Sequence, residues 1–296
     1  MFSEKFARFP AQDVREMPDR VVKNGPEIIT SPESESLLEF HDFLLRNFKP
    51  GEVEPLKTWQ EEMKQTDPKV RFIATVLREP LDKQKPIVGA AYGSVQGGIL
   101  AIRFTLTEAK YYLGYPVVKQ AKKPGFEGFR GYRGSGISQE ADRLLIAEAK
   151  HQQKLMDPKQ KLNVLICEAV NKSEAYWNGV EIEKGNGMKR LYRPDNDEQM
   201  YYRLPPLEWN ADGSPVNNTV VFENLQIAMA GHPRNIPVDR LEQILRKWWD
   251  SWYIRSRENF EDDKAWGKHK QLVYKILEEE IIQPIKGFKR VKFIFS

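Results

Sequence analysis

The pattern of apolar and polar residues divides the first part of the chain into an irregular arm and two helices. Residues Met1 to Ile29 show little periodicity, so we expect an irregular arm there. Ser31 or Ser34 can then cap the amides of a first helical turn. Helical spacing of apolar residues follows at Leu37, Leu38, Phe40, Leu44, Leu45 and Phe48. This pattern predicts a helix, and "PLKTWQEEMKQTD" from Pro55 predicts a second, shorter amphipathic helix.

Three strand-like runs come next, in close order. They are Val70 to Glu79, Ile87 to Val95 and Ile99 to Glu108. The breaks between them, "PLDKQKP" and "QGG", are short and rich in turn-forming residues, which favours an antiparallel meander. Residues 109–130 are longer than a connection needs, so we interpret them as an ordered insertion. Its aromatic residues could line an acceptor or acyl pocket or simply pack on the sheet: Tyr111, Tyr112, Tyr115 and Phe126.

The middle of the chain alternates between helix and strand. A helix is predicted from Ile137 to about Gln153, followed by the strand "LNVLICEAV" and a short helix, "NKSEAYWNG". The segments "GMKRLYRP" and "EQMYYRLPPL" are typical of a strand pair, and "VVFENLQIAMAG" of a further strand. The order strand, helix, strand indicates an α/β fold with a mixed, largely antiparallel sheet that contains a crossover.

Beyond "GHPRNIP", Gly231 to Pro237, the pattern turns mostly helical. Two amphipathic segments cover residues 238–260 and 263–285, and "KGFKRVKFIFS" is typical of an edge strand. Four tryptophans lie in these segments and are expected to pack against the sheet, an exposed partner surface being the alternative: Trp248, Trp249, Trp252 and Trp266. We therefore expect an arm (1–29), an α/β domain (30–231) and a C-terminal helical extension (232–296) packed on it.

Composition and charge narrow the function classes. The 296 residues carry 46 Lys and Arg against 42 Asp and Glu, a formal charge of +4, which permits nucleic-acid binding without indicating it. The single cysteine, Cys167, lies in an apolar run and is expected to be a small buried hydrophobe. With no signal peptide or membrane-length apolar run in the sequence, we expect a cytoplasmic protein. The four histidines are scattered, which disfavours a metal site.

Two glycines precede the middle helix, in "RGSGIS" from Arg133 to Ser138. A helix start has unpaired N–H groups and a partial positive charge, so it can hold a phosphate where the preceding turn lets the backbone approach closely. Gly134 and Gly136 remove the Cβ obstruction, and Arg133 adds a cation. The residues match neither the P-loop nor the dinucleotide fingerprint. A purely structural turn and an arginine-glycine RNA patch are the alternatives.

These residues resemble the phosphate motif of the GNAT superfamily of acyl-CoA-dependent N-acyltransferases, Arg/Gln-x-x-Gly-x-Gly/Ala. Arg133, Gly136 and Ser138 fall on the three fixed places, and Ser138 departs from the last of them. The order of elements is similar too, with Asn171 and Tyr176 ahead of a Gly-apolar step, Gly187-Met188. The likeness covers about residues 29–231 and leaves the C-terminal helices outside.

The resemblance implies a ligand and a reaction. Splayed strands and the helix start would bind the pantetheine and pyrophosphate of acetyl-CoA or another acyl-CoA, with the amides of Gly134, Ser135, Gly136, Ile137 and Ser138 on the phosphates and Asn171 beside the cofactor. A primary amine of a small molecule or peptide would then attack the thioester directly. No metal is implied.

The resemblance also suggests catalytic residues. Tyr176 is the candidate proton donor to the leaving thiolate, although Trp177 could hold the same place and both could be core aromatics. Glu168 is the preferred general base, because its strand is otherwise apolar and would raise its pKa, and Glu108 is the alternative. Either glutamate could instead be a solvated surface residue.

Two other functions stay open at this point. A protein with this fold could bind acyl-CoA without catalysis, as a sensor or interaction module, and the tryptophan-rich helices could then bind a partner. A transferase acting on charged tRNA is less favoured, because the net charge is small. The sequence names neither the amine acceptor nor the acyl length, and it leaves open whether the chain forms a homo-oligomer.

Overall fold

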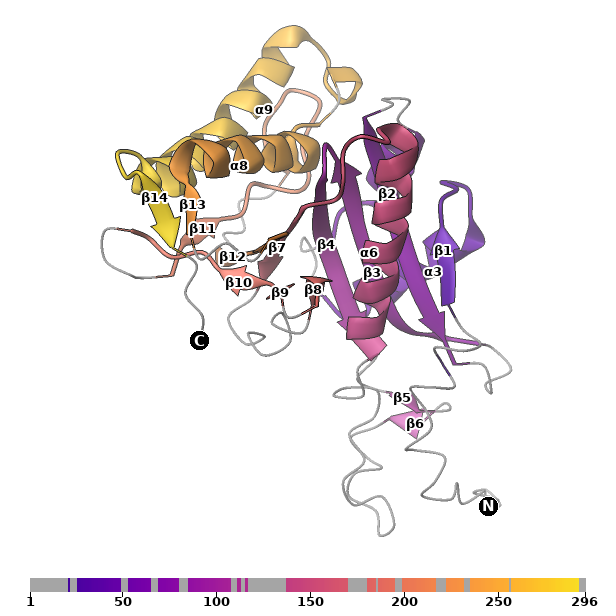
Figure 1. The fold of residues 1–296 in the computed structure, drawn as a ribbon. Coiled ribbons are helices and arrows are strands. Elements are labelled where there is room, and N and C mark those ends of the chain that lie inside the picture. The colour runs from indigo at the N-terminus through magenta and orange to yellow at the C-terminus, as the bar shows by residue number, and fades with distance from the viewer. Residues whose placement is uncertain are drawn as a thin grey trace, which may run out of the picture.

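A mixed sheet forms the centre of the molecule (Figure 1). The computed structural model describes residues 21, 26–48, 53–64, 69–79, 85–107, 111–112, 115–116, 137–169, 180–184, 186–194, 199–216, 222–231, 235–255 and 257–292. Eight strands lie in the order β1-β2-β3-β4-β7-β12-β10, with β11 also paired to β12. They are β1 (Pro26–Ile29), β2 (Val70–Arg78), β3 (Ile87–Gln96), β4 (Ile99–Thr107), β7 (Val164–Ala169), β10 (Lys189–Arg190), β11 (Tyr201–Arg203) and β12 (Phe222–Met229).

The predicted meander and crossover are both confirmed. Strands β2, β3 and β4 pair antiparallel along most of their length. The "QGG" turn places Gly97 and Gly98 at φ 55° and 82°, a region that glycine enters without steric cost. Helix α6 (Ile137–Met156) then carries the chain over the sheet, so that β7 lies parallel to β4. All other strand pairs of this sheet are antiparallel.

Helix α6 covers one face of the sheet. Its apolar side packs with alternate residues of β2, β3, β4 and β7, including Leu100 and Leu165, in one buried core. The helix ends at Met156, three residues later than the pattern suggests, and Pro158 follows, which cannot continue a helix. Cys167 is buried in the same core, as expected.

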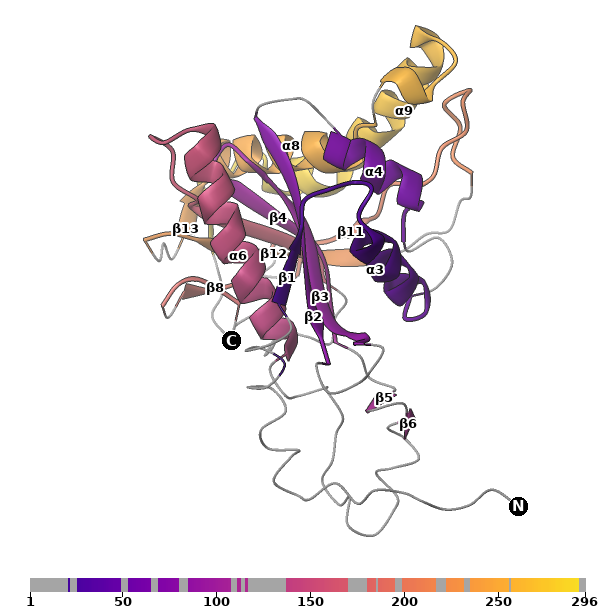
Figure 2. The ribbon, with the colours of Figure 1, turned by 90° about the vertical axis from the view of Figure 1, so that its right-hand side faces the viewer.

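The opposite face carries the two N-terminal helices, α3 (Glu35–Leu45) and α4 (Leu56–Lys64) (Figure 2). Both were predicted from the apolar pattern. They pack on β2 and β3 through an aromatic core in which the ring of Trp59 stacks on that of Tyr92, with the centroids 4.6 Å apart. This core is distinct from the one under α6, because the two use alternate residues of the same strands.

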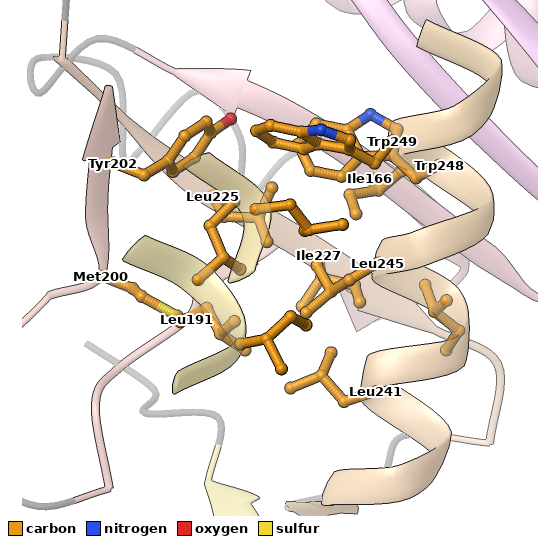
Figure 3. Close-up of a cluster of buried hydrophobic side chains, with 14 of the residues drawn as sticks. Ile166, Leu191, Met200, Tyr202, Leu225, Ile227, Leu241, Leu245, Trp248 and Trp249 are labelled. Atoms are coloured by element: carbon orange, nitrogen blue, oxygen red, sulfur yellow. The ribbon is translucent and has the colours of Figure 1, made fainter. Parts of the chain in front are cut away.

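The C-terminal helices lie beside the remaining part of that second face, with α8 packed directly on the sheet (Figure 1). They are α8 (Val238–Tyr253) and α9 (Asp263–Ile276), which continues through a π-helical turn, η2 (Leu277–Ile282), and a short 3-10 turn, η3 (Gln283–Ile285). A short 3-10 turn, η1 (Arg257–Asn259), joins them. Figure 3 shows Trp248 and Trp249 of α8 packed against Ile166 of β7 and Leu225 of β12. The predicted packing is confirmed for Trp248, Trp249 and Trp252, which are buried, whereas Trp266 is half-buried.

Several short elements differ from the sequence expectation. Pro26–Ile29, expected to be part of an irregular arm, forms β1 and pairs with β2. The edge of β2 supplies its backbone hydrogen bonds, and a strand of four residues is too short to show a pattern in the sequence. Strands β10 and β11 both pair with β12, joined by a bridge between Tyr192 and Gln199. The predicted last strand is β14 (Arg290–Lys292), and it pairs with β13 (Asn235–Pro237) in a separate two-stranded sheet.

Two further small hairpins complete the described elements. Strands β5 (Tyr111–Tyr112) and β6 (Tyr115–Pro116) pair within the predicted insertion, and β8 (Glu181–Glu183) pairs with β9 (Asn186–Gly187). The rest of residues 109–130, including Phe126, lies outside the described residues, as does the predicted short helix 171–179. Over the part of the chain that is described, none of the helices has the length and apolar content that crossing a bilayer demands.

Candidate functional site

The sheet divides between its two parallel strands. Strands β4 and β7 pair over Ile99–Ile102 and Val164–Cys167, four pairs in all among the described strand residues. Beyond these pairs β4 continues to Thr107 beside β3, and β7 continues to Ala169 beside β12. Both strands therefore stay paired on their outer sides, while no pair between them is described beyond Ile102 and Cys167. We call this place the β4–β7 gap.

A bulge in β4 lies where the gap begins. Ile102 is opposite Gly93 of β3 and Phe104 is opposite Tyr92, so Arg103 is an extra residue in β4. Bulges bend a strand and increase its twist, which ends pairing on the far side. Gly93 permits this geometry, because a Cβ there would lie 2.3 Å from the carbonyl oxygen of Ala101. The bulge thus accounts for the loss of pairing after Ile102.

The N-terminus of α6 lies at the same end of the sheet as the gap. Gly89 of β3 is opposite Thr107, the last residue of β4, and a Cβ at Gly89 would approach Cγ2 of Ile137 to 2.4 Å. Ile137 is the first residue of α6 and is 1% exposed. The first amides of α6, with their partial positive charge, are therefore held at the end of β4 that has left β7.

Buried polar groups fix α6 to this part of the sheet. The Thr105 hydroxyl of β4 donates a hydrogen bond of 2.6 Å to Oδ1 of Asp142, a buried residue of α6. The Thr75 hydroxyl donates one of 3.0 Å to the carbonyl oxygen of Ala141. Burial of a carboxylate is costly unless it is hydrogen-bonded, so a shift of α6 that broke the Asp142 contact would be unfavourable. These hydrogen bonds therefore fix the position of α6 in addition to its apolar packing. Neither Asp142 nor Thr105 forms part of a local motif, so the sequence alone does not indicate their role.

Two amide side chains lie on the other side of the gap. Asn224 and Gln226 of β12 are both buried, and Nε2 of Gln226 donates a hydrogen bond of 2.8 Å to Oδ1 of Asn224. They stand opposite Ala169 and Cys167 of β7, and share a face of β12 with Ala228 of the α6-side core. The α6 side of the sheet therefore carries polar groups on both flanks of the gap.

A buried ion cluster lies behind the bulge, on the face opposite α6. It consists of Glu54, Glu62, Arg103 and Arg255, whose side chains are at most 9% exposed. The Arg103 guanidinium contacts Glu54 and donates to Glu62 at 2.9 Å, and that of Arg255 donates to Glu54 at 2.7 Å and to Glu62 at 3.1 Å. Trp59 Nε1 donates to Glu54 at 2.9 Å, and the Tyr92 hydroxyl donates to Glu62 at 3.1 Å.

The two carboxyl groups of the buried ion cluster differ in pKa. Burial alone would raise the pKa of Glu54, but Arg103 and Arg255 outweigh it, so the pKa is lowered and Glu54 is held ionised. Burial raises the pKa of Glu62 above its ordinary value, and the nearby charge of Glu54 adds to this despite the attraction of Arg103. Two carboxylates and two guanidinium groups balance in charge only while all four are present.

The sequence-predicted site residues fall unevenly on the described part of the chain. Ile137 and Ser138 begin α6 beside the gap. Glu168 is the first β7 residue beyond the four that pair with β4, and its backbone lies opposite Leu225. The others lie outside the described residues: Glu108, Arg133, Gly134, Ser135, Gly136, Asn171, Tyr176 and Trp177. Among the residues that the structure does describe, no three His, Cys, Asp or Glu side chains form a group suited to a metal ion.

Comparison with known proteins gives matches among solved structures alone. No protein-family model matches the sequence. No curated protein matches it either.

The matching structures include GNAT acetyltransferases. One from Bacteroides thetaiotaomicron shares 12% identity at a TM-score of 0.39, covering 76% of this chain and 96% of its own. An N-acetyltransferase from Lactobacillus plantarum shares 10% identity at a TM-score of 0.35, and the match covers 70% of this chain and 99% of that protein. An Escherichia coli enzyme that acetylates the alanine of a ribosomal protein shares 13% identity at a TM-score of 0.33, and the match covers 70% of this chain and 97% of that protein. At such low identities and TM-scores the comparison assigns neither substrate nor reaction to this chain.

Proposed function

We propose that this chain is an acyl-CoA-dependent N-acyltransferase, which moves an acetyl or longer acyl group to a primary amine of a small molecule or peptide. The observation that carries the proposal is the β4–β7 gap with the start of α6 at its end. A gap between parallel strands offers backbone N–H and C=O groups to an extended amide chain such as pantetheine. A helix N-terminus at the same end suits a pyrophosphate.

The reaction needs a base, an acid and an aligned thioester. The attacking amine must lose a proton, and its nitrogen forms a bond to the thioester carbon. The carbon–sulfur bond then breaks and releases CoA thiolate. Glu168 is our candidate base because it follows directly on the last β7 residue paired with β4. Tyr176 is our candidate donor of the proton that the thiolate takes up, and rests on the sequence resemblance alone. Backbone amides at the gap would stabilise the oxyanion of the tetrahedral intermediate.

Ligand binding provides the first test. We expect CoA and acetyl-CoA to raise the midpoint of thermal unfolding, since a ligand that binds the native state alone stabilises it, while NAD and ATP leave it unchanged. Titration calorimetry with CoA, acetyl-CoA and longer acyl-CoAs measures the affinities. An equal response to ATP would point to a general anion site and contradict the proposal.

Turnover provides the second test. Thiol release from acetyl-CoA is followed with a panel of primary amines and peptide N-termini. Glu168→Gln and Tyr176→Phe should each lower kcat at least about tenfold while CoA affinity stays within about twofold. Glu279→Gln, an exposed position on η2, is the matched control and should leave kcat unchanged. If CoA binds and no amine is acylated, the non-catalytic acyl-CoA sensor replaces the transferase as the better proposal.

A further inference from the structure

The bulged residue of β4 is tied to parts of the chain far from it in sequence. Arg103 is the extra residue of the bulge, and the pairing with β7 ends at Ile102, immediately before it. Its side chain is 5% exposed and leaves the sheet on the face opposite α6. Whatever holds this side chain therefore acts on the strand at the point where the β4–β7 gap begins.

The contacts of Arg103 leave its side chain little freedom. The guanidinium pairs with both carboxylates of the buried ion cluster and donates a hydrogen bond of 3.1 Å to the carbonyl oxygen of Trp252. It also lies over the indole ring of Trp252, 5.0 Å from the centroid. Charge-assisted hydrogen bonds in a buried setting are strong and directional, so they fix the guanidinium relative to α4 and α8.

Arg255 completes the cluster from the C-terminal region. It lies two residues beyond the end of α8 and donates to the same carboxylates, Glu54 at 2.7 Å and Glu62 at 3.1 Å. Its own backbone is anchored by α9: its N–H donates to Nε2 of His269 at 3.0 Å, and its carbonyl oxygen accepts from Nε1 of Trp266 at 3.1 Å. Arg255 therefore connects the C-terminal helices to the carboxylates that hold Arg103.

We propose that Arg255 is a positioning residue for the β4–β7 gap, acting through Glu54 and Glu62 on Arg103, so that the C-terminal helices are part of what keeps the gap open. Loss of Arg255 leaves two buried carboxylates with one guanidinium. The excess charge is relieved by proton uptake or by water entry, and either one weakens the hold on Arg103. The bulge then loses its anchor, and the local structure of β4 around the gap loosens. For its ligand, this inference rests on the proposed function.

The central test compares Arg255→Gln with Arg246→Gln. Arg246 is a matched control because it also lies in the C-terminal region and pairs with two glutamates, Glu242 and Glu278, neither of which belongs to the buried ion cluster. Amide hydrogen exchange is followed by mass spectrometry in residues 103–107 of β4, with residues 225–229 of β12 as the internal reference for global opening. CoA affinity is measured by titration calorimetry on the same preparations.

We expect Arg255→Gln to speed exchange in residues 103–107 at least about tenfold relative to residues 225–229, and to weaken CoA binding at least about tenfold. Arg246→Gln should change the exchange ratio and the affinity by less than about twofold. Equal acceleration in β4 and β12 would mean that Arg255 serves global stability only, and would overturn the proposal. So would an unchanged exchange ratio in folded Arg255→Gln.

Arg255→Lys keeps the test decisive if the glutamine variant does not fold. Lysine restores the positive charge without the paired geometry of a guanidinium, so we expect the same selective change in β4 at a smaller size. A lysine variant with wild-type exchange in β4 and wild-type CoA affinity would contradict the positioning role. If the wild-type chain binds no CoA, the proposed function fails, and the exchange ratio alone then decides whether Arg255 positions β4.

Discussion

His269 of α9 is a fully buried histidine. It is 0% exposed, and its ring meets that of Trp209 edge-on and stacks on that of Phe260, with centroid distances of 4.3 Å and 4.9 Å. Burial, together with the positive charges of Arg255 and Lys270, lowers the pKa of His269 from 6.5 to about 3. The ring therefore stays neutral in the folded chain, and its Nε2 can accept the N–H of Arg255.

This histidine should make the folded state sensitive to acid. Because the folded pKa is about 3 and the ordinary value is 6.5, the unfolded chain binds more protons than the folded chain between these values. The contribution of His269 to the free energy of unfolding is therefore present above about pH 6.5 and is lost as the pH is lowered toward about 3. The loss is about 2 kcal/mol between about pH 7 and about pH 5.

The measurement is urea unfolding at a series of pH values for the wild type and His269→Gln. Glutamine keeps an acceptor for Arg255 and does not titrate. The free energy of unfolding of His269→Gln should therefore change by about 2 kcal/mol less than that of the wild type between about pH 7 and about pH 5. Parallel pH curves for the two proteins would show that His269 does not carry the effect.

At the scale of elements, the position of α6 on the sheet depends on the absence of a side chain at Gly89. The methyl Cγ2 of Ile137 occupies the space where a Cβ of Gly89 would lie, and Cγ2 is attached directly to Cβ, so it cannot swing far away. Thr105 and Asp142 then fix the next turn of the helix. Close contact between β3 and α6 thus determines where the helix begins relative to the β4–β7 gap.

Gly89→Ala should therefore destabilise the chain by about 1–3 kcal/mol through overpacking, as measured by urea unfolding. Ile137→Ala alone should cost about 2–4 kcal/mol, because it leaves a cavity. In the double variant the new methyl enters that cavity, and the two costs should fall short of additivity by at least about 1 kcal/mol.

The control is Gly267→Ala in α9, where a Cβ meets no atom within 4 Å. Alanine favours a helix over glycine, so this variant should gain about 0.5–1 kcal/mol. Additive costs for Gly89→Ala and Ile137→Ala would refute the close contact between β3 and α6.

At the scale of the whole molecule, the C-terminal helices and the sheet share one core. Residues of β4, β7 and β12 lie in the same buried cluster as Leu241, Leu245, Trp248 and Trp249 of α8 (Figure 3). The buried ion cluster adds a second connection, through Arg255. The domain boundary at residue 232 stays a prediction. The described residues of α8 and α9 that are buried in this cluster share it with strands of the sheet.

Heat unfolding should accordingly show a single cooperative transition. Removal of α8 and α9 would expose one face of β4, β7 and β12, so neither part is expected to persist without the other. Differential scanning calorimetry measures this, and the calorimetric and van't Hoff enthalpies should agree. Two resolved transitions, or a folded fragment ending near residue 231, would be incompatible with a shared core.

Local patterns were sufficient for most of the longer described elements. Helices α3, α4, α6, α8 and α9 and strands β2, β3, β4, β7 and β12 follow from apolar periodicity and turn residues, both of which act over a few neighbouring residues. Strand β1 was missed because four residues show no period and depend on the edge of β2 for their hydrogen bonds. The start of α6 at Ile137 also follows from the sequence, through the glycines that precede it.

The sequence by itself thus determined most of the longer elements, their order and the helix start to which we assign phosphate binding. The tertiary structure alone decided that β4 leaves β7 after Ile102, that Arg103 is a bulged residue, and that Arg255 shares its carboxylates with Arg103. The reason is physical: a bulge and a buried ion pair depend on partners up to 201 residues apart in the chain, and a local pattern carries no information on which distant groups will meet.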